Sequence, residues 1–177
     1  MLSNAHNALL EELTARYRGA LGADEATYLG HVRRVLGFYA SLRGAPLDER
    51  DIVAAFFHDL GIWTDRTNDY LPPSIEAARA YLEETGRAGD ADLVTAMIDN
   101  HHKLRAYAGP HEERVEPFRR ADLVDFSFGL YSAGLPRQEL RAAFTEIPPG
   151  AFRRFLIGLA GKWLLKYPTR PFPIFRL

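Results

Sequence analysis

Apolar residues recur every three or four positions along most of this 177-residue chain, and this spacing constrains the fold more than any other feature of the sequence. Such spacing places apolar side chains on one face of an α-helix. The clearest examples are Leu9, Leu13 and Tyr17, followed by Tyr28, Val32, Val35 and Phe38. No stretch of useful length alternates between apolar and polar residues, as a half-buried strand would. The sequence therefore predicts an all-α fold, built as a bundle of helices.

Capping and breaking residues predict where the third helix begins and ends. Asp48 is a good N-cap for a helix that continues through the apolar run 52–57. Gly61 predicts the end of that helix as a left-handed C-cap. Residues 63–71 are rich in Thr, Asn and Asp and are expected to form a loop.

The second half of the chain continues the helical pattern. Proline is favoured in the first turn of a helix, so Pro72 and Pro73 predict the start of a helix that stops before Gly86. Four more helices, the first of them capped by Asp90, are expected over about 90–107, 112–133, 137–144 and 150–167. The Pro/Phe-rich tail at about 167–177 should be extended and pack on the body or on a second subunit, so a homodimer stays open. No linker divides the chain, and residues 1–177 are expected to form a single domain.

The charge balance and the lack of cysteine narrow the function. Lysine and arginine number 22 against 23 aspartate and glutamate residues, so no basic field is present to attract a nucleic-acid polymer. No window approaches the roughly 20 apolar residues that cross a bilayer, and we expect a cytoplasmic protein without a membrane partner. Because the chain has no cysteine, a metal site must be built from histidine and carboxylate.

The strongest local signal is the doublet His58 and Asp59, at the end of the apolar third helix. Neighbouring helical residues diverge by about 100 degrees, so both can reach one ion only where the helix ends. Imidazole with carboxylate suits manganese, iron, cobalt, nickel or zinc. A simpler interpretation is a hydrogen-bonded pair that closes the helix. His31 on the second helix and Asp122 further along could converge with the doublet, which favours the metal.

The order His31, His58 and Asp59, then Asp122 resembles the HD-domain metal-dependent phosphohydrolase superfamily, a helical fold named for the doublet. The resemblance covers about residues 28–131 and is carried by the segments 30–35 (GHVRRV), 57–61 (FHDLG) and 120–125 (RADLVD). It implies an HD-type helical domain that holds a divalent transition metal on these four side chains, with one ion expected and two allowed. It also implies hydrolysis of a small phosphate ester, such as a nucleotide, by metal-activated water. Asp59 would be the catalytic carboxylate that orients the water or bridges a second ion.

An adjacent histidine pair, His101 and His102, resembles a pair found in several HD families. His101 shares an apolar stripe with Met97, so we predict that it faces the interior as a catalytic group, either a phosphate donor or a ligand for a second ion. We predict that His102, Lys103 and Arg34 bind the phosphate substrate, because charged donors suit phosphate oxygens. Alternatively, both histidines are satisfied residues of the helix face and most of the cations are solvated.

Several other features leave alternatives open. Asp125 either holds a metal-binding histidine or forms a surface ion pair. Trp63, Tyr70 and Tyr107 either line a base-stacking pocket or fill the core. Some HD nucleotidases carry a glutamate shortly after the doublet and some dinuclear members, including oxygenases, carry a lysine there, but this chain has neither. Phosphate-ester hydrolysis is the leading prediction, with a di-iron oxygenase of the same superfamily or a non-catalytic helical signalling module as alternatives.

Overall fold

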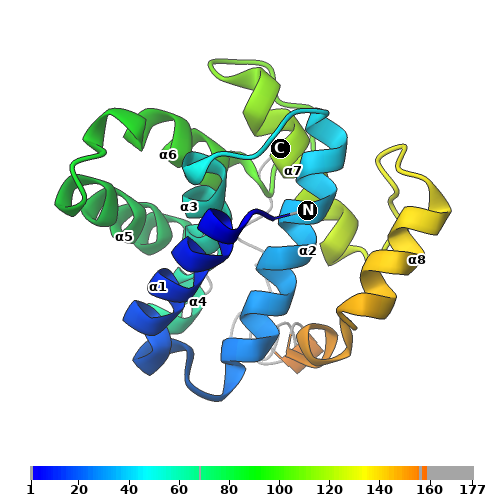
Figure 1. The fold of residues 1–177 in the computed structure, drawn as a ribbon, viewed down its shortest axis with the longest axis horizontal. Helices are drawn as coiled ribbons and strands as arrows, with labels where there is room; N and C mark the ends of the chain where they lie inside the picture. Colours follow the sequence, from blue (N-terminus) through cyan, green and yellow to red (C-terminus); the bar gives the residue numbers. More distant parts are fainter. Residues whose placement is uncertain (1, 68, 156, 159–177) are drawn as a thin grey trace, which may run out of the picture.

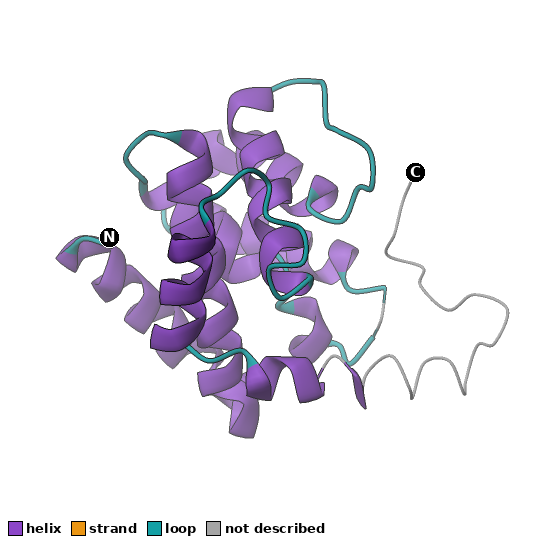
Figure 2. Ribbon diagram, turned by 90° about the vertical axis from the view of Figure 1, so that its right-hand side faces the viewer, coloured by secondary structure: helices purple, strands orange, loops and turns teal. Residues whose placement is uncertain are grey.

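The structure, a computed structural model, describes residues 2–67, 69–155 and 157–158. Its helices (Figure 1) are α1 (Asn4–Leu21), α2 (Glu25–Arg43), α3 (Glu49–Phe57), α4 (Gly61–Thr64), α5 (Leu71–Glu84), α6 (Ala91–Asn100), α7 (Glu112–Phe126) and α8 (Arg137–Glu146). Short 3-10 turns at Gly22–Asp24 and Ala88–Asp90 precede α2 and α6. The described residues contain no strand (Figure 2), which confirms the all-α prediction.

Helix α3 forms the centre of the core. It packs on α1, α2, α5 and α6, and every residue of its apolar run 52–57 is buried. A helix that is apolar on all sides is stable only when it is enclosed in this way. Helices α2 and α7 pack along each other, whereas α5 and α6 form a hairpin on the other side of α3 (Figure 1). The ends of α3 and α6 and the middle turns of α2 and α7 therefore face one interior region.

Two predicted helix starts are confirmed. The Asp48 carboxylate accepts a hydrogen bond from the Arg50 backbone N–H, and the Asp51 carboxylate accepts one from the Asp48 backbone N–H, which forms a capping box before α3. Helix α5 begins at Leu71 with its prolines in the first turn. Asp90 lies at the N-cap position of α6, but its side chain makes no capping hydrogen bond.

The predicted role of Gly61 was wrong, because this glycine begins α4 and has no left-handed backbone. A glycine is required there by close packing instead. A β-carbon at position 61 would lie 2.4 Å from the Tyr70 carbonyl oxygen and 2.9 Å from Pro73, and the Gly61 N–H donates to Ser74 Oγ at 2.9 Å. The helical turn that follows also shortens the loop predicted over 63–71.

Two helices end earlier than the sequence pattern predicts. Helix α6 stops at Asn100 rather than near residue 107, and at this end the ring of His101 donates to the Ile98 carbonyl, which a continuing helix would use for a backbone hydrogen bond. Helix α7 stops at Phe126 rather than at residue 133. There Phe128 adopts a left-handed backbone, and the Gly129 N–H donates to the Val124 carbonyl, a closure typical of helix C-termini.

The C-terminal predictions are tested only in part. Residues 150–155 and 157–158 are helical, within the helix expected over 150–167. The tail predicted at about 167–177 lies outside the described residues, and the prediction of one domain over 1–177 stays a prediction. Among the helices of the described part, none has the length and apolar character needed to cross a membrane.

Candidate metal centre

Six polar side chains from four parts of the bundle meet in its interior. They are His31 in α2, His58 and Asp59 after α3, His101 and His102 after α6, and Asp122 in α7. None of the six residues is more than 8% exposed. Groups of this kind are stable at such depth only when they are paired or bound to a metal. The structure thus brings together every predicted ligand, while the roles assigned to each remain predictions.

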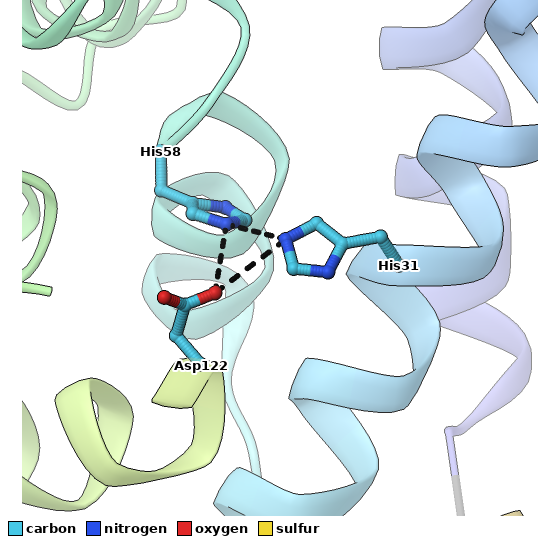
Figure 3. A group of neighbouring side chains, drawn as sticks. All are labelled: His31, His58 and Asp122. Atoms are coloured by element: carbon cyan, nitrogen blue, oxygen red, sulfur yellow. Dashed lines mark hydrogen bonds and ion pairs between the residues drawn. The ribbon is translucent and has the colours of Figure 1, made fainter. Parts of the chain in front are cut away.

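The first donor group consists of His31 Nε2, His58 Nε2, Asp59 Oδ2 and Asp122 Oδ1. The two ring nitrogens lie 2.9 Å apart, and the two carboxylate oxygens lie 3.4 or 3.5 Å from them. Figure 3 shows His31, His58 and Asp122 pointing toward a common centre. Donor atoms about 2.1 Å from a shared ion are about 3.0–3.4 Å apart in octahedral or tetrahedral coordination. The spacing of His31, His58 and Asp122 therefore fits one transition-metal ion, and Asp59 Oδ2 lies beside the two histidines of that group.

Hydrogen bonds to the other ring nitrogens fix which nitrogen of each histidine is available. The Nδ1–H of His58 donates to the Ala55 carbonyl, and the Nδ1–H of His101 donates to the Ile98 carbonyl, both at 2.7 Å. A carbonyl can only accept, so in the neutral ring Nε2 carries the lone pair. The Nδ1–H of His31 donates to Asp125 Oδ2 at 2.7 Å. All three histidines thus turn Nε2 toward the cluster, and in the neutral ring this nitrogen carries the lone pair that binds a metal.

Asp125 and Arg34 support the first donor group through hydrogen bonds that fix the position of His31. Asp125 is fully buried, and its two oxygens accept hydrogen bonds from the Arg34 guanidinium at 2.5 and 2.8 Å while also holding His31. Of the two interpretations of Asp125, the structure therefore favours the one in which it holds a histidine. Arg34 is buried in this ion pair and also donates to the Ile147 carbonyl, so it is not a solvated cation, while its role as a substrate contact stays a prediction.

A second donor group lies on the other side of the same two carboxylates. Asp59 Oδ1 is 3.3 Å from His101 Nε2 and 3.9 Å from His102 Nε2, and Asp122 Oδ2 is 3.7 Å from His102 Nδ1. Asp59 Oδ1 and His101 Nε2 are buried without a hydrogen-bond partner. Each carboxylate thus offers one oxygen to each group, and the orphaned pair is a polar site that a cation would satisfy.

The pKa values of the cluster residues show how their charges are balanced when no metal is bound. Burial opposes the charged form of His31, but hydrogen bonds with Asp125 and Asp59 outweigh this effect and raise its pKa to about 10. Burial likewise opposes ionisation of Asp122, yet the surrounding histidines lower its pKa to about 2. Burial and the neighbouring His101 lower the pKa of His102 to about 3, so this ring is neutral. Without a metal, bound protons compensate the two carboxylates.

A small cavity adjoins the second donor group. It has a volume of about 10 Å³, room for about one water molecule. Its lining includes His101, His102, Lys103, Leu104 and Asp122. The Lys103 ammonium lies over the Tyr107 ring, 5.5 Å from its centroid, and Leu104 is exposed. Lys103 is therefore the predicted substrate contact that remains nearest to solvent and beside the cluster.

Aromatic rings lie against the cluster, and of these the sequence singled out Trp63 and Tyr70 but not Phe152 or Phe155. Phe152 stacks on His31 with a centroid distance of 4.1 Å, and Phe155 stacks on Trp63 at 4.8 Å. Tyr70 is buried and its hydroxyl forms a hydrogen bond with His102 Nε2. No sequence signal marks Phe152, because it lies in a short apolar segment far from the motifs. Tyr70 was recognised as an aromatic near the site, but not as a partner of His102.

Comparison with known proteins supplies no family. The sequence matches no protein-family model, and a search of curated proteins and of solved structures gives no match. The helical bundle and its buried histidine and aspartate cluster, which could hold a metal ion, are therefore what the structure itself establishes.

Proposed function

We propose that this chain is a metal-dependent phosphohydrolase of the HD-domain superfamily. The observation that carries the proposal is the approach of His31 Nε2 and His58 Nε2 to 2.9 Å, each with its other nitrogen donating to a fixed acceptor. At that distance a proton or a metal ion must lie between the two nitrogens, and a metal ion can replace the proton that His31 holds in the metal-free protein. The order of the ligands along the chain, with the His58 and Asp59 doublet in the middle, supports the superfamily assignment.

The donor set fits a divalent transition metal. Imidazole nitrogens and carboxylate oxygens together suit manganese, iron, cobalt, nickel or zinc. His31, His58, Asp59 and Asp122 would hold the ion, and His101 and His102 with the outer carboxylate oxygens would hold a second one. When bound, such an ion lowers the pKa of water toward neutrality and neutralises charge on a phosphate group.

Individual side chains would orient the water, transfer protons and neutralise the phosphate. Asp59 has one oxygen on each donor group, so it is placed to orient an attacking water and to accept its proton. His101, which can carry a proton because Asp59 and Asp122 raise its pKa against the effect of burial, is placed to donate to a phosphate oxygen or to the leaving group. Lys103 lies beside the small cavity and can neutralise the bound phosphate. A phosphate ester is larger than this cavity, so Lys103 and the exposed Leu104 must move as it binds.

The test is hydrolysis by the full chain, purified without chelator and loaded separately with each of the five metals. A panel of phosphomonoesters and nucleotides should release phosphate from at least one loaded form, and a chelator should abolish the release. In a single turnover in oxygen-18 water, label should enter the released phosphate. A phosphorylated residue trapped on the protein would refute water as the nucleophile.

Two outcomes would replace the proposal. Oxygen consumption by the iron-loaded protein on a polyol or phosphonate, without phosphate release, would favour an oxygenase, which also uses two ions that share carboxylates. Metal binding without turnover on any substrate would favour a non-catalytic signalling module.

A further inference from the structure

Tyr70 occupies a position that links the two halves of the cluster. It is the residue before α5, its ring is buried, and its hydroxyl forms a hydrogen bond with His102 Nε2. Its carbonyl accepts from the Ser74 backbone N–H at 3.0 Å and passes so close to Gly61 that a β-carbon would not fit there. Since Gly61 lies two residues after Asp59, the backbone that carries the doublet and the backbone that carries Tyr70 are packed as one unit.

The hydrogen bond to Tyr70 decides which nitrogen of His102 can bind a metal. With Nε2 held by the phenol, the remaining nitrogen is Nδ1, and it faces Asp122 Oδ2 at 3.7 Å. The same arrangement exists at His31, where Asp125 holds one nitrogen and the other faces the first donor group. An oxygen partner behind a ligating histidine fixes its tautomer and orientation.

We propose that Tyr70 is a positioning residue that holds His102 with its Nδ1 lone pair turned toward the second donor group. This inference rests on the proposed metal centre but adds a residue and a tautomer to it. In the ligating form, the Nε2–H of His102 donates to the Tyr70 oxygen. A tyrosine hydroxyl is neutral at neutral pH, so the partner of His102 is a neutral phenol. A neutral phenol is a weaker acceptor than the carboxylate of Asp125, which makes His102 the less basic ligand.

The variant that isolates this bond is Tyr70→Phe, which keeps the ring and removes only the hydroxyl. Tyr81→Phe is the matched control, because Tyr81 lies in α5, the helix that Tyr70 precedes, but its hydroxyl contacts Glu12 and Arg87 away from the cluster. Both variants of the full chain are titrated with zinc chloride while nitrogen-15 signals of the histidine rings are followed by NMR. These signals report tautomer and ligation directly and do not depend on turnover.

In the wild type and in Tyr81→Phe, the Nδ1 signal of His102 should shift on addition of zinc, and the zinc-bound ring should carry its proton on Nε2, where it donates to the Tyr70 oxygen. In Tyr70→Phe, His102 should become a mixture of tautomers, and the zinc affinity read at His102 should fall about 10–100-fold. The affinity read at His31 and His58 should change by less than about twofold, since their partners are intact.

An Nδ1 signal of His102 that ignores zinc in the wild type, or a Tyr70→Phe titration identical to that of Tyr81→Phe, would overturn the inference. Failure of the wild type to hydrolyse any phosphate ester would instead count against the proposed function, and the zinc titration would still decide the role of Tyr70.

Discussion

The ends of α3 and α6 have the same local structure but different neighbours. Each helix stops at a histidine, His58 or His101, whose Nδ1–H donates to the carbonyl three residues earlier. The next residue is an aspartate after His58 and a histidine after His101. At the first end, the Nε2 nitrogen lies within 2.9 Å of His31, which is itself held by Asp125. At the second end, the Nε2 nitrogen of His101 has no hydrogen-bond partner.

Under the proposed function, this difference would suit the two donor groups to different purposes. The first group is supported by a buried carboxylate and guanidinium, which suits an ion that stays bound. The second group has orphaned atoms, a phenol as its support and the small cavity beside it. Such a site suits an ion or a phosphate oxygen that comes and goes during turnover.

The largest expected effect comes from removing a residue that belongs to both groups. Asp59→Ala takes an oxygen from each, so metal affinity should fall by more than the roughly 10–100-fold that loss of a supporting residue causes. Metal content by mass spectrometry measures this. Circular dichroism should remain helical, and Asp92→Ala, at an exposed aspartate, is the matched control. Wild-type metal content in Asp59→Ala would disprove the assignment.

Removing Asp125, which supports the first group, should lower both the stability of the fold and the affinity for metal. Asp125→Ala leaves the Arg34 guanidinium buried without its carboxylate, which should cost about 3–5 kcal/mol in free energy of unfolding, measured by urea denaturation in the presence of chelator. Zinc affinity should fall about 10–100-fold by calorimetry.

A double variant separates these two roles of Asp125. Arg34→Met combined with Asp125→Leu removes the whole ion pair, so most of the stability should return. Zinc affinity should stay low, because His31 still lacks its acceptor. Recovery of both properties would show that Asp125 acts on metal binding only through the stability of the fold.

Within the second group, the two histidines should contribute unequally to turnover. His101 is the closer to Asp59 and can donate a proton, so His101→Ala should lower kcat/KM by about 100-fold or more, the range of general acid–base catalysis. His102→Ala should lower it by about tenfold, as loss of a weaker ligand would. Equal losses in the two variants on one substrate would contradict this division.

The effect that requires no substitution is a pH dependence that the two groups should not share. Because the pKa of His31 is raised to about 10 in the metal-free protein, the first ion must displace a proton, and its apparent affinity should rise about tenfold per pH unit between pH 7 and 9. The same raised pKa stabilises the metal-free fold below about pH 6.5, and this contribution is lost as the pH rises through about 10.

His102 has a lowered pKa of about 3 and holds no such proton at neutral pH. Calorimetry in two buffers with different ionisation enthalpies counts the protons released with each ion. An affinity of the first ion that does not change with pH would refute the bound proton.

Local sequence signals predicted the parts of the fold that local interactions decide. The capping residue Asp48 and the pair Pro72 and Pro73 marked helix starts correctly, since a cap acts within its own turn. The ends of α6 and α7 were placed too late, because the apolar pattern continues past the point where the chain turns. At His101 the turn accompanies a side-chain bond to the Ile98 carbonyl, which no periodicity reveals.

Prediction of the site was limited in the same way, because tertiary contacts do not appear in local sequence patterns. The histidines and aspartates that could be ligands were evident as residue types on particular helix faces, and the structure brings them together. Arg34, by contrast, cannot be distinguished in the sequence from an arginine that is exposed to solvent. Its burial depends on Asp125, which lies far along the chain. Tyr70 and Phe152 touch the cluster only through tertiary packing. Their partners therefore could not be deduced from spacing along the sequence.

The spread of the ligands from residue 31 to residue 122 ties occupancy of the centre to the folding equilibrium. An unfolded chain does not bring these four helical regions together, so an ion binds the native state far more tightly than the unfolded one. By mass action, a free-metal concentration 100 times the dissociation constant adds about 2.7 kcal/mol to the free energy of unfolding. The proposed metal centre would therefore make the melting temperature of this protein a measure of the metal available to it.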